Sequence, residues 1–153
     1  MQPSAGKVRA IAVLVVLHQG SIFVFEGRDL VKGETFYRPL GGTIEFGEHS
    51  SQTVVRELRE EIQAEITALR FLGTCENVFT HNGQPGHEIV LVYQGEFTDA
   101  SFYATPVRMG REDNGEAFRA LWMRLADFSA RKFPLYPDGL FELLASQNLT
   151  EAA

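Results

Sequence analysis

The hydrophobic pattern of the first third of the chain predicts a strand hairpin followed by shorter extended segments. Positions 8–17 are almost entirely apolar and rich in valine, isoleucine and leucine, which is typical of a strand that is buried on both faces. Turn-forming residues at 18–20 separate it from a return strand at 21–26. The segments that follow predict a polar loop at 27–34, a short strand at 35–38, and a loop with a short strand at 41–46.

The pattern beyond position 65 predicts a long hairpin, a mobile loop, one more strand and two helices. Segment 66–80 alternates imperfectly between apolar and polar residues and predicts one long or bent strand, and segment 87–97 predicts the next strand. The residues between them favour a turn. Segment 98–115 shows no periodicity, so we expect a mobile loop there. The last predicted elements are a strand at 116–125, a short helix at 126–130, and a helix that begins at the N-cap Asp138 and ends near 147.

Between these two sets of strands, the sequence predicts an amphipathic helix from about Ser50 to Ile62. At about 100° per residue, one arc of this helix carries the apolar side chains of Val54, Val55, Leu58 and Ile62. Three glutamates, Glu57, Glu60 and Glu61, lie together along the edge of this arc. Such residues commonly form a solvated face with weak ion pairs. Their position beside the buried stripe also allows them to hold a hard cation.

The residues before the helix favour the cation site. Gly41 and Gly42 precede it, and a glycine pair lets the backbone approach an anion or expose a carbonyl to a metal. Glu48 follows Gly42 at a fixed offset, so that the whole segment reads G-x5-E-x7-R-E-L-x-E-E. A pattern with this many fixed points is far more specific than a lone glycine-rich motif.

This pattern resembles the signature of the Nudix hydrolases, G-x5-E-x7-R-E-U-x-E-E-x-G-U, in which U is a bulky aliphatic residue. The matching positions are Gly42, Glu48, Arg56, Glu57, Leu58, Glu60 and Glu61. The chain departs from the signature at Gln63, which replaces a glycine, and at Ala64, which replaces the last aliphatic residue. Because glutamine adopts the left-handed conformation less readily than glycine, we predict that the helix runs further or ends differently.

The resemblance implies an α+β fold of the Nudix type, an α/β/α sandwich with a mixed sheet between helices. Residues 1–153 would form a single domain, with a loose N-terminal end at 1–6. The implied cofactor is Mg²⁺, with Mn²⁺ as a substitute, and the implied metal site consists of the carboxylates of Glu57, Glu60 and Glu61 with the carbonyl of Gly41.

The resemblance also implies roles for residues around this metal site. Glu48 would orient the site or hold a second metal through water, and Arg56 would pair with a signature carboxylate. The general base would be Glu57 or a glutamate of a distant loop. In this chain the loop candidates are Glu112 and Glu116, and we favour Glu116 because it directly precedes a strand. Arg38 and Gly42 are expected to contact the phosphates of the substrate.

The composition narrows the range of partners. A net charge of -6 argues against binding polymeric nucleic acid through a basic surface. It is compatible with a small nucleotide, because a bound divalent metal inverts the local charge. Cys75 is the only cysteine, which favours a reducing, cytoplasmic setting. The longest apolar run, 10–17, is too short to span a membrane, and we recognise no signal peptide.

We therefore expect a hydrolase that cleaves a phosphoanhydride bond in a nucleoside diphosphate linked to a moiety X. Nucleoside triphosphates, ADP-ribose, nucleotide sugars and dinucleoside polyphosphates all fit this description. One alternative is a Nudix-like domain that binds a nucleotide without cleaving it. Another is an isomerase of a prenyl diphosphate, which would need a catalytic cysteine in a recognisable context, and Cys75 has none. A homodimer is compatible with the sequence, with the N-terminal strand as one contact.

Overall fold

Two β-sheets form the centre of the computed structural model, which describes residues 6–151. The first sheet contains β1 (Val8–Val15), β5 (Leu40–Thr43), β6 (Ile66–His81) and β7 (Gln84–Phe97), in the order β5-β1-β7-β6. Strand β1 runs parallel to β7, whereas the β1–β5 and β6–β7 pairs are antiparallel, so this sheet is mixed. The predicted loose end at 1–6 falls, apart from Gly6, outside the described residues.

The second sheet is antiparallel. It contains β2 (Leu17–His18), β3 (Ser21–Asp29), β8 (Val107–Arg111) and β9 (Ala117–Arg124), in the order β2-β3-β9-β8. Strand β4 (Glu34–Arg38) pairs with β3 in addition. The predicted hairpins are thus present, and the long one, β6–β7, pairs from Ile66 to His81.

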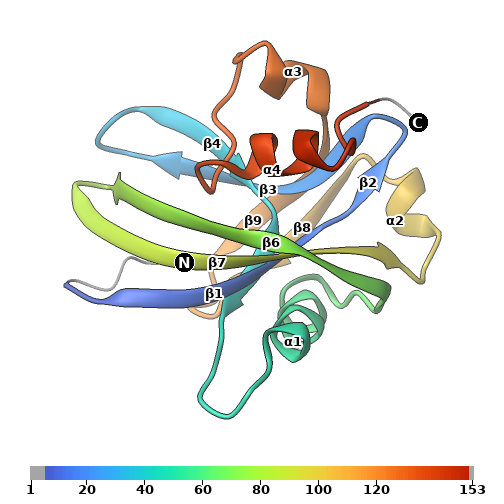
Figure 1. The fold of residues 1–153 in the computed structure, drawn as a ribbon, viewed down its shortest axis with the longest axis horizontal. Coiled ribbons are helices and arrows are strands. Elements are labelled where there is room, and N and C mark those ends of the chain that lie inside the picture. Colours follow the sequence, from blue (N-terminus) through green and yellow to red (C-terminus); the bar gives the residue numbers. More distant parts are fainter. Residues whose placement is uncertain (1–5, 152–153) are drawn as a thin grey trace.

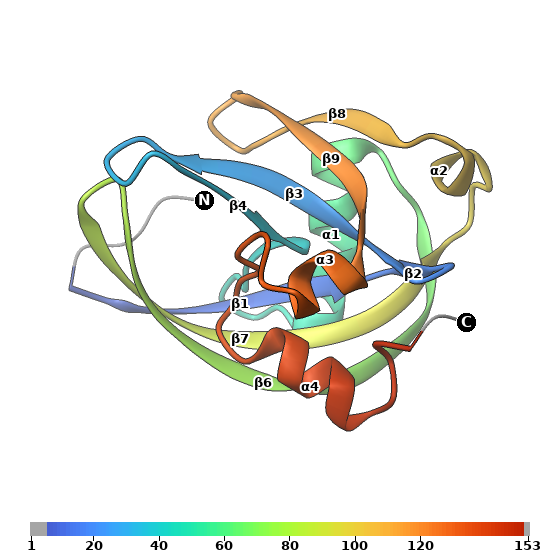
Figure 2. The same cartoon turned by 90° about the horizontal axis from the view of Figure 1, so that it is seen from above.

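Helices lie on both sides of the first sheet (Figures 1 and 2). Helix α1 (Ser50–Ile62) lies on one side, and α4 (Leu140–Ser146) lies on the other. The short helices α2 (Ser101–Ala104) and α3 (Leu125–Ser129) flank the second sheet. The predicted α+β fold with a mixed sheet between helices is confirmed.

The apolar character of β1 follows from this arrangement. Its side chains alternate between two hydrophobic clusters, because successive residues of a strand point to opposite faces. Ala12 and Leu14 pack in the cluster that contains Leu58 of α1. Ile11 and Val13 pack in the cluster that contains Leu140 and Leu144 of α4. A strand that is covered on both faces has no position for a polar side chain in its central part, which explains the uninterrupted apolar run.

Three predicted boundaries were wrong. Strand β3 continues to Asp29 through the predicted loop at 27–34, because it pairs with β4 over this length. The predicted mobile loop at 98–115 contains α2 and β8, and β8 is held by backbone pairing with β9 rather than by an apolar pattern. Helix α4 begins after Gly139, whereas the backbone N–H of the predicted N-cap Asp138 donates to Asn77 Oδ1.

The predicted extension of α1 was also wrong. The helix ends at Ile62, and Gln63 adopts the left-handed conformation (φ 52°, ψ 37°) in which the family signature has glycine. The N–H groups of Gln63 and Ala64 donate to the carbonyls of Arg59 and Leu58 at 3.0 and 3.1 Å. Ala64 is 1 % exposed, so these two bonds and the burial of Ala64 offset a left-handed strain of about 1–2 kcal/mol.

Replacing Gln63 with glycine should therefore stabilise the protein. Glycine removes the left-handed strain but also gives the unfolded chain more freedom, so we expect a net gain of about 0.5 kcal/mol in the free energy of unfolding. Urea denaturation measures this change. Gln63→Ala is the control, because it removes the same side chain and keeps the strained Cβ. An equal gain in both variants would show that the side chain, and not the backbone, is responsible.

Candidate functional site

Two adjoining cavities bring most of the predicted site residues together. The smaller cavity, of about 190 Å³, is lined by residues of the signature segment and of the β8–β9 loop, among them Gly41, Gly42, Glu57, Glu61 and Asp113. The larger cavity, of about 530 Å³, lies between the two sheets. Arg38 and Glu112 line both cavities, so the two spaces meet at these residues.

The glycine pair is required by two close approaches. A Cβ atom on Gly42 would lie 2.4 Å from the carboxyl carbon of Glu57, and one on Gly41 would lie 2.0 Å from the carbonyl oxygen of Ala12 in β1. Both distances are shorter than any side chain allows. The glycines therefore let the Glu57 carboxylate rest directly on the backbone of β5 while β5 stays paired with β1.

Helix α1 buries two of its carboxylates. Glu57 is 4 % and Glu61 is 6 % exposed, and they share the buried side of the helix with Leu58 and Ile62, while Val55 is only half-buried. Burial raises the pKa of both carboxyl groups, that of Glu61 to about 9, and the neighbouring Glu57 contributes to the rise at Glu61. Among the described residues, no group donates a hydrogen bond to the buried Oε1 of Glu61.

Arg56 links the signature carboxylates. Its Nε and Nη2 donate to the two carboxylate oxygens of Glu48 at 2.8 and 3.0 Å. Its Nη1 donates to Glu57 at 2.9 Å and to Glu60 at 3.3 Å. The guanidinium group holds the pKa of Glu48 at about 2, well below its usual range. Glu48 thus fixes Arg56, and Arg56 in turn fixes Glu57, which lines the smaller cavity, and Glu60 on the next turn of the helix.

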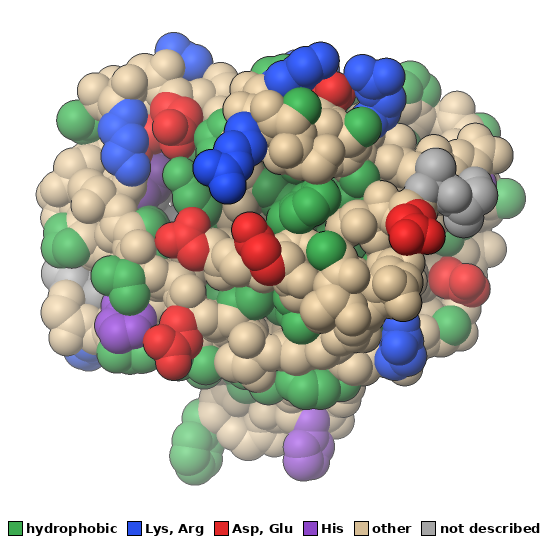
Figure 3. Space-filling model, turned by 45° about the horizontal axis from the view of Figure 1, so that its top comes forward, with side chains coloured by type: hydrophobic (Ala, Val, Ile, Leu, Met, Phe, Trp, Pro, Cys, Tyr) green, Lys and Arg blue, Asp and Glu red, His purple; other side chains and the backbone are tan. Residues whose placement is uncertain are grey.

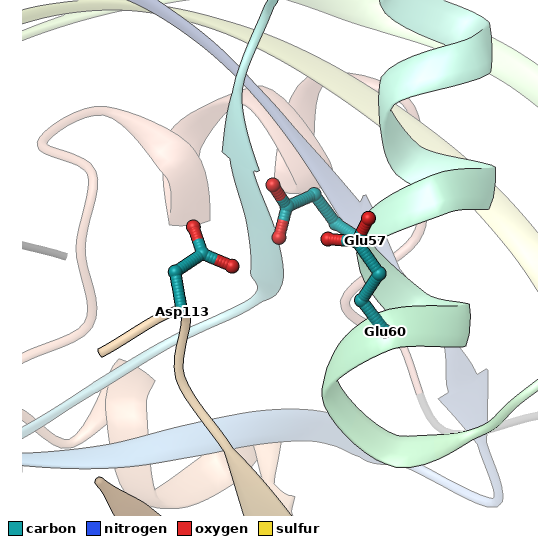
Figure 4. A group of neighbouring side chains, drawn as sticks. All are labelled: Glu57, Glu60 and Asp113. Atoms are coloured by element: carbon teal, nitrogen blue, oxygen red, sulfur yellow. The ribbon is translucent and has the colours of Figure 1, made fainter. Parts of the chain in front are cut away.

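A third carboxylate comes from outside the helix (Figure 4). Asp113, in the loop between β8 and β9, points toward Glu57 and Glu60, and one oxygen of each residue lies within 4.8 Å of the others. The sequence pattern pointed to Glu112 and Glu116 in this loop but not to Asp113. In the sequence, Asp113 is only one of three acidic residues in the segment 112–116, and their order does not show which side chain points toward α1.

Residues 7–144 match the model of the NUDIX domain family. The chain belongs to the NUDIX domain family. The resemblance inferred from the signature segment is therefore confirmed, with the match covering nearly the whole chain rather than that segment alone.

Solved structures share the Nudix fold of this chain at low sequence identity. A MutT NUDIX hydrolase from Burkholderia pseudomallei is 19 % identical, with coverage of 96 % of this chain and 98 % of that one and a TM-score of 0.59. For a NUDIX hydrolase from Nitrosomonas europaea the identity is 17 %, the coverage 93 % and 89 %, and the TM-score 0.60. A chain from the structures of MutT from Aliivibrio salmonicida and Vibrio cholerae is 21 % identical. The match covers 92 % of this chain and 99 % of that one, with a TM-score of 0.55.

The acidic residues in and beside the smaller cavity fit the divalent metal on which Nudix proteins typically depend. Glu57, Glu60 and Asp113 offer only carboxylate oxygens, which are the ligands preferred by Mg²⁺ and Mn²⁺. The backbone at Gly42 approaches Glu57 without an intervening side chain, and Glu61 keeps one buried oxygen without a donor. Glu61 lines this cavity but does not belong to the group of three converging oxygens.

Arg38 places a positively charged side chain at the junction of the two cavities. The guanidinium carbon of Arg38 lies 4.5 Å from the centroid of the Phe25 ring, a cation–π contact. Its Nη1 is buried and has no hydrogen-bond partner among the described residues. Buried donors are rarely left without an acceptor, so Arg38 is positioned to bind an anion between the cavities.

The loop candidates for the general base differ in position. Glu112 lines both cavities, whereas Glu116 lines the larger one alone. The backbone N–H of Glu112 donates to the carbonyl of Glu116 at 2.9 Å, which places the two residues on opposite sides of the loop that joins β8 to β9. The structure thus brings Glu112 to the buried carboxylates and leaves Glu116 outside the smaller cavity.

The outer surface of the Nudix domain is mixed in charge. On the face shown in Figure 3, acidic side chains are interspersed with Lys and Arg side chains, so neighbouring charges of opposite sign reduce the net field there. Within residues 6–151, no helix combines the length and the apolar character that a membrane span requires.

Proposed function

We propose that this chain is a Mg²⁺-dependent hydrolase, with residues 1–153 as one catalytic domain, that cleaves a phosphoanhydride bond in a nucleoside diphosphate linked to a moiety X. The observation that carries the proposal is the convergence of the Glu57, Glu60 and Asp113 carboxylates beside a cavity lined by Arg38, whose buried Nη1 has no hydrogen-bond partner among the described residues. Acidic oxygens for a cation and a free donor for an anion are the two requirements of a metal–diphosphate complex.

Each residue has a role that follows from its contacts. Glu57, Glu60 and Asp113 would hold Mg²⁺ (or Mn²⁺), with Glu61 beside Glu57 and the Gly41 carbonyl completing the site. The ion, when bound, would polarise a phosphoryl group and favour the ionisation of water. Glu48 and Arg56 act as positioning residues, because they touch the carboxylates rather than the substrate space.

The substrate would span both cavities. Arg38 would donate to a phosphate oxygen at the junction, and Gly42 leaves the backbone open beside the diphosphate. The larger cavity would hold the nucleoside, because Phe36, Phe79 and Phe118 contribute aromatic rings to its lining. Aromatic rings stack on any base and so favour a nucleoside without selecting one base.

A hydrolysis screen tests this proposal. The protein would be incubated with Mg²⁺ or Mn²⁺ and a panel of nucleoside triphosphates, ADP-ribose, nucleotide sugars and dinucleoside polyphosphates. We expect metal-dependent release of phosphate, diphosphate or nucleoside monophosphate from one class. Binding of a nucleotide without cleavage of any compound, with either metal, would contradict the proposal and favour a sensor.

The same assay distinguishes the two loop glutamates. We propose Glu112 as the residue that accepts a proton from the attacking water, because it borders the smaller cavity and Glu116 does not. Glu112→Gln should lower kcat by about 10²–10⁴-fold, and Glu116→Gln should leave kcat within about threefold. Comparison of kcat for the two variants provides the measurement, and the reverse ranking would assign the role to Glu116.

A further inference from the structure

Two hairpin turns form the end of the larger cavity that lies away from Glu57 and Glu61. We call these two turns the interhairpin clasp. It consists of residues 29–32, where β3 turns into β4, and residues 80–82, where β6 turns into β7. All of these residues except Val31 line the larger cavity. Figure 2 shows the two tips side by side at one end of the molecule, and Figure 1 shows that they belong to different sheets.

Side chains rather than strand pairing hold the two tips together. The N–H of Leu30 donates to Asn82 Oδ1 at 2.7 Å, and the N–H of Asn82 donates to Asp29 Oδ2 at 3.2 Å. The ammonium group of Lys32 donates to the carbonyl of Thr80 at 2.8 Å. Asp29 is 2 % exposed and also accepts from two N–H groups of its own turn, Val31 and Lys32. The clasp therefore depends on a few specific bonds.

The strand register gives the distance from the phosphate-binding position to the clasp. Phe25 of β3 is the strand partner of Arg38 in β4, and its ring also contacts the Arg38 guanidinium group. Asp29 of the clasp is the strand partner of Glu34. The four residue-to-residue steps from Phe25 to Asp29 span about 13 Å of strand. A space of this length and of about 530 Å³ suits one small-molecule group. It is too short for two such groups placed end to end.

We propose that the interhairpin clasp closes the far end of the larger cavity and limits the group bound there to a single, unextended nucleoside. This inference rests on the proposed function, since it assigns the nucleoside to that cavity. The clasp acts as a specificity determinant and not in the chemistry. Substrates whose base carries a further large group meet the wall formed by Asp29, Leu30 and Asn82, whereas extensions on the phosphate side of Arg38 do not.

The test compares the best adenine, guanine or cytosine substrate of the hydrolysis screen with the same compound carrying a benzyl group on the exocyclic amine of its base. In the wild-type protein, kcat/KM for the benzyl compound should be lower by about 100-fold, a typical size for steric exclusion. Asn82→Gly removes Oδ1 but suits the left-handed backbone of this position (φ 50°). It should reduce the discrimination about tenfold.

Asn148→Gly is the matched control, because Asn148 is also left-handed (φ 59°) and lies outside the cavity, so its discrimination should equal that of the wild type. Lys32→Met is a second variant that loosens the clasp without changing the turn. Amide hydrogen exchange at Leu30 reports opening independently of activity and should become faster in Asn82→Gly.

The outcomes separate the two proposals. If no parent compound is hydrolysed, the proposed function fails. If the parent is hydrolysed and the wild type accepts the benzyl compound equally well, the size limit is wrong. It is also wrong if exchange at Leu30 rises while discrimination stays constant, or if neither quantity changes in Asn82→Gly and Lys32→Met. Only reduced discrimination together with faster exchange supports the clasp as the limiting wall.

Discussion

Glu57→Gln should lower kcat by about 10³-fold and leave the fold intact. The glutamine oxygen can still accept the bond that Arg56 Nη1 now donates to Glu57 at 2.9 Å, so the shape of the site is kept. The substitution removes a negative charge from the converging group of Glu57, Glu60 and Asp113. Because a metal ion supplies several kcal/mol of transition-state stabilisation, a weaker metal site loses most of the rate. Steady-state kinetics at saturating substrate and a Mg²⁺ titration measure both effects.

Glu76→Gln serves as the control for this prediction. Glu76 is exposed on β6 and lines neither cavity, so its substitution changes the net charge equally and should leave kcat unaltered.

We also expect the metal-free Glu57→Gln protein to unfold at a higher urea concentration than the wild type. Burial raises the pKa of Glu57, which means that the folded protein holds the ionised form of this carboxylate at a cost. A Glu57→Gln variant with the kcat of the wild type would contradict the proposed metal site.

Arg56→Met should lower both stability and kcat. Arg56 holds Glu48 through two bonds and also bonds to Glu57 and Glu60. Removing the shared partner of these partly buried ion pairs leaves Glu48 and the buried Glu57 without compensation, so we expect a loss of about 2 kcal/mol in the free energy of unfolding. The released Glu57 and Glu60 side chains would lose their orientation, and kcat should fall by about 10²-fold. Urea denaturation and steady-state kinetics provide the two measurements.

Arg59→Met is the matched control on the same helix. Arg59 bonds to Glu65 at 2.7 and 2.8 Å, a geometry as good as that of Arg56, but both side chains are more than half exposed. Exposed pairs contribute little, so this variant should resemble the wild type in stability and turnover. Equal losses in the two variants would mean that Arg56 serves the helix in general and not the carboxylate site.

The sequence predicted the position of α1 well, although not the way it ends, because several signals agree there. The apolar spacing of Val54, Leu58 and Ile62 sets the helical period, and the signature residues before and within it define where it lies. The fold class followed from the order of the elements and from the family resemblance. Glu57 and Glu61 also lie where the helical period placed them, at the edge of the apolar stripe, although their burial required the glycine backbone of β5.

Other features depend on contacts between distant segments, which a single sequence does not encode locally. Strand β8 pairs with β9 through its backbone, and that pairing aims Asp113 at a helix some fifty positions earlier in the chain. The bond from Leu30 to Asn82 joins two turns of different sheets. The prediction for Gln63 failed because the burial of Ala64 and two hydrogen bonds to carbonyl groups outweighed the intrinsic preference of the left-handed conformation for glycine.

The alternation of β1 between two hydrophobic clusters constrains the chain more tightly than any of its side chains does. Exchanging Val13 for isoleucine changes one cluster slightly, and neighbouring side chains can adjust. Deleting one residue before Ile11 would instead send Ile11 and Val13 to the face of α1, and Ala12 and Leu14 to that of α4. Homologues should accordingly vary in the identity of these residues but not in their number, so that gaps in an alignment are absent from this strand.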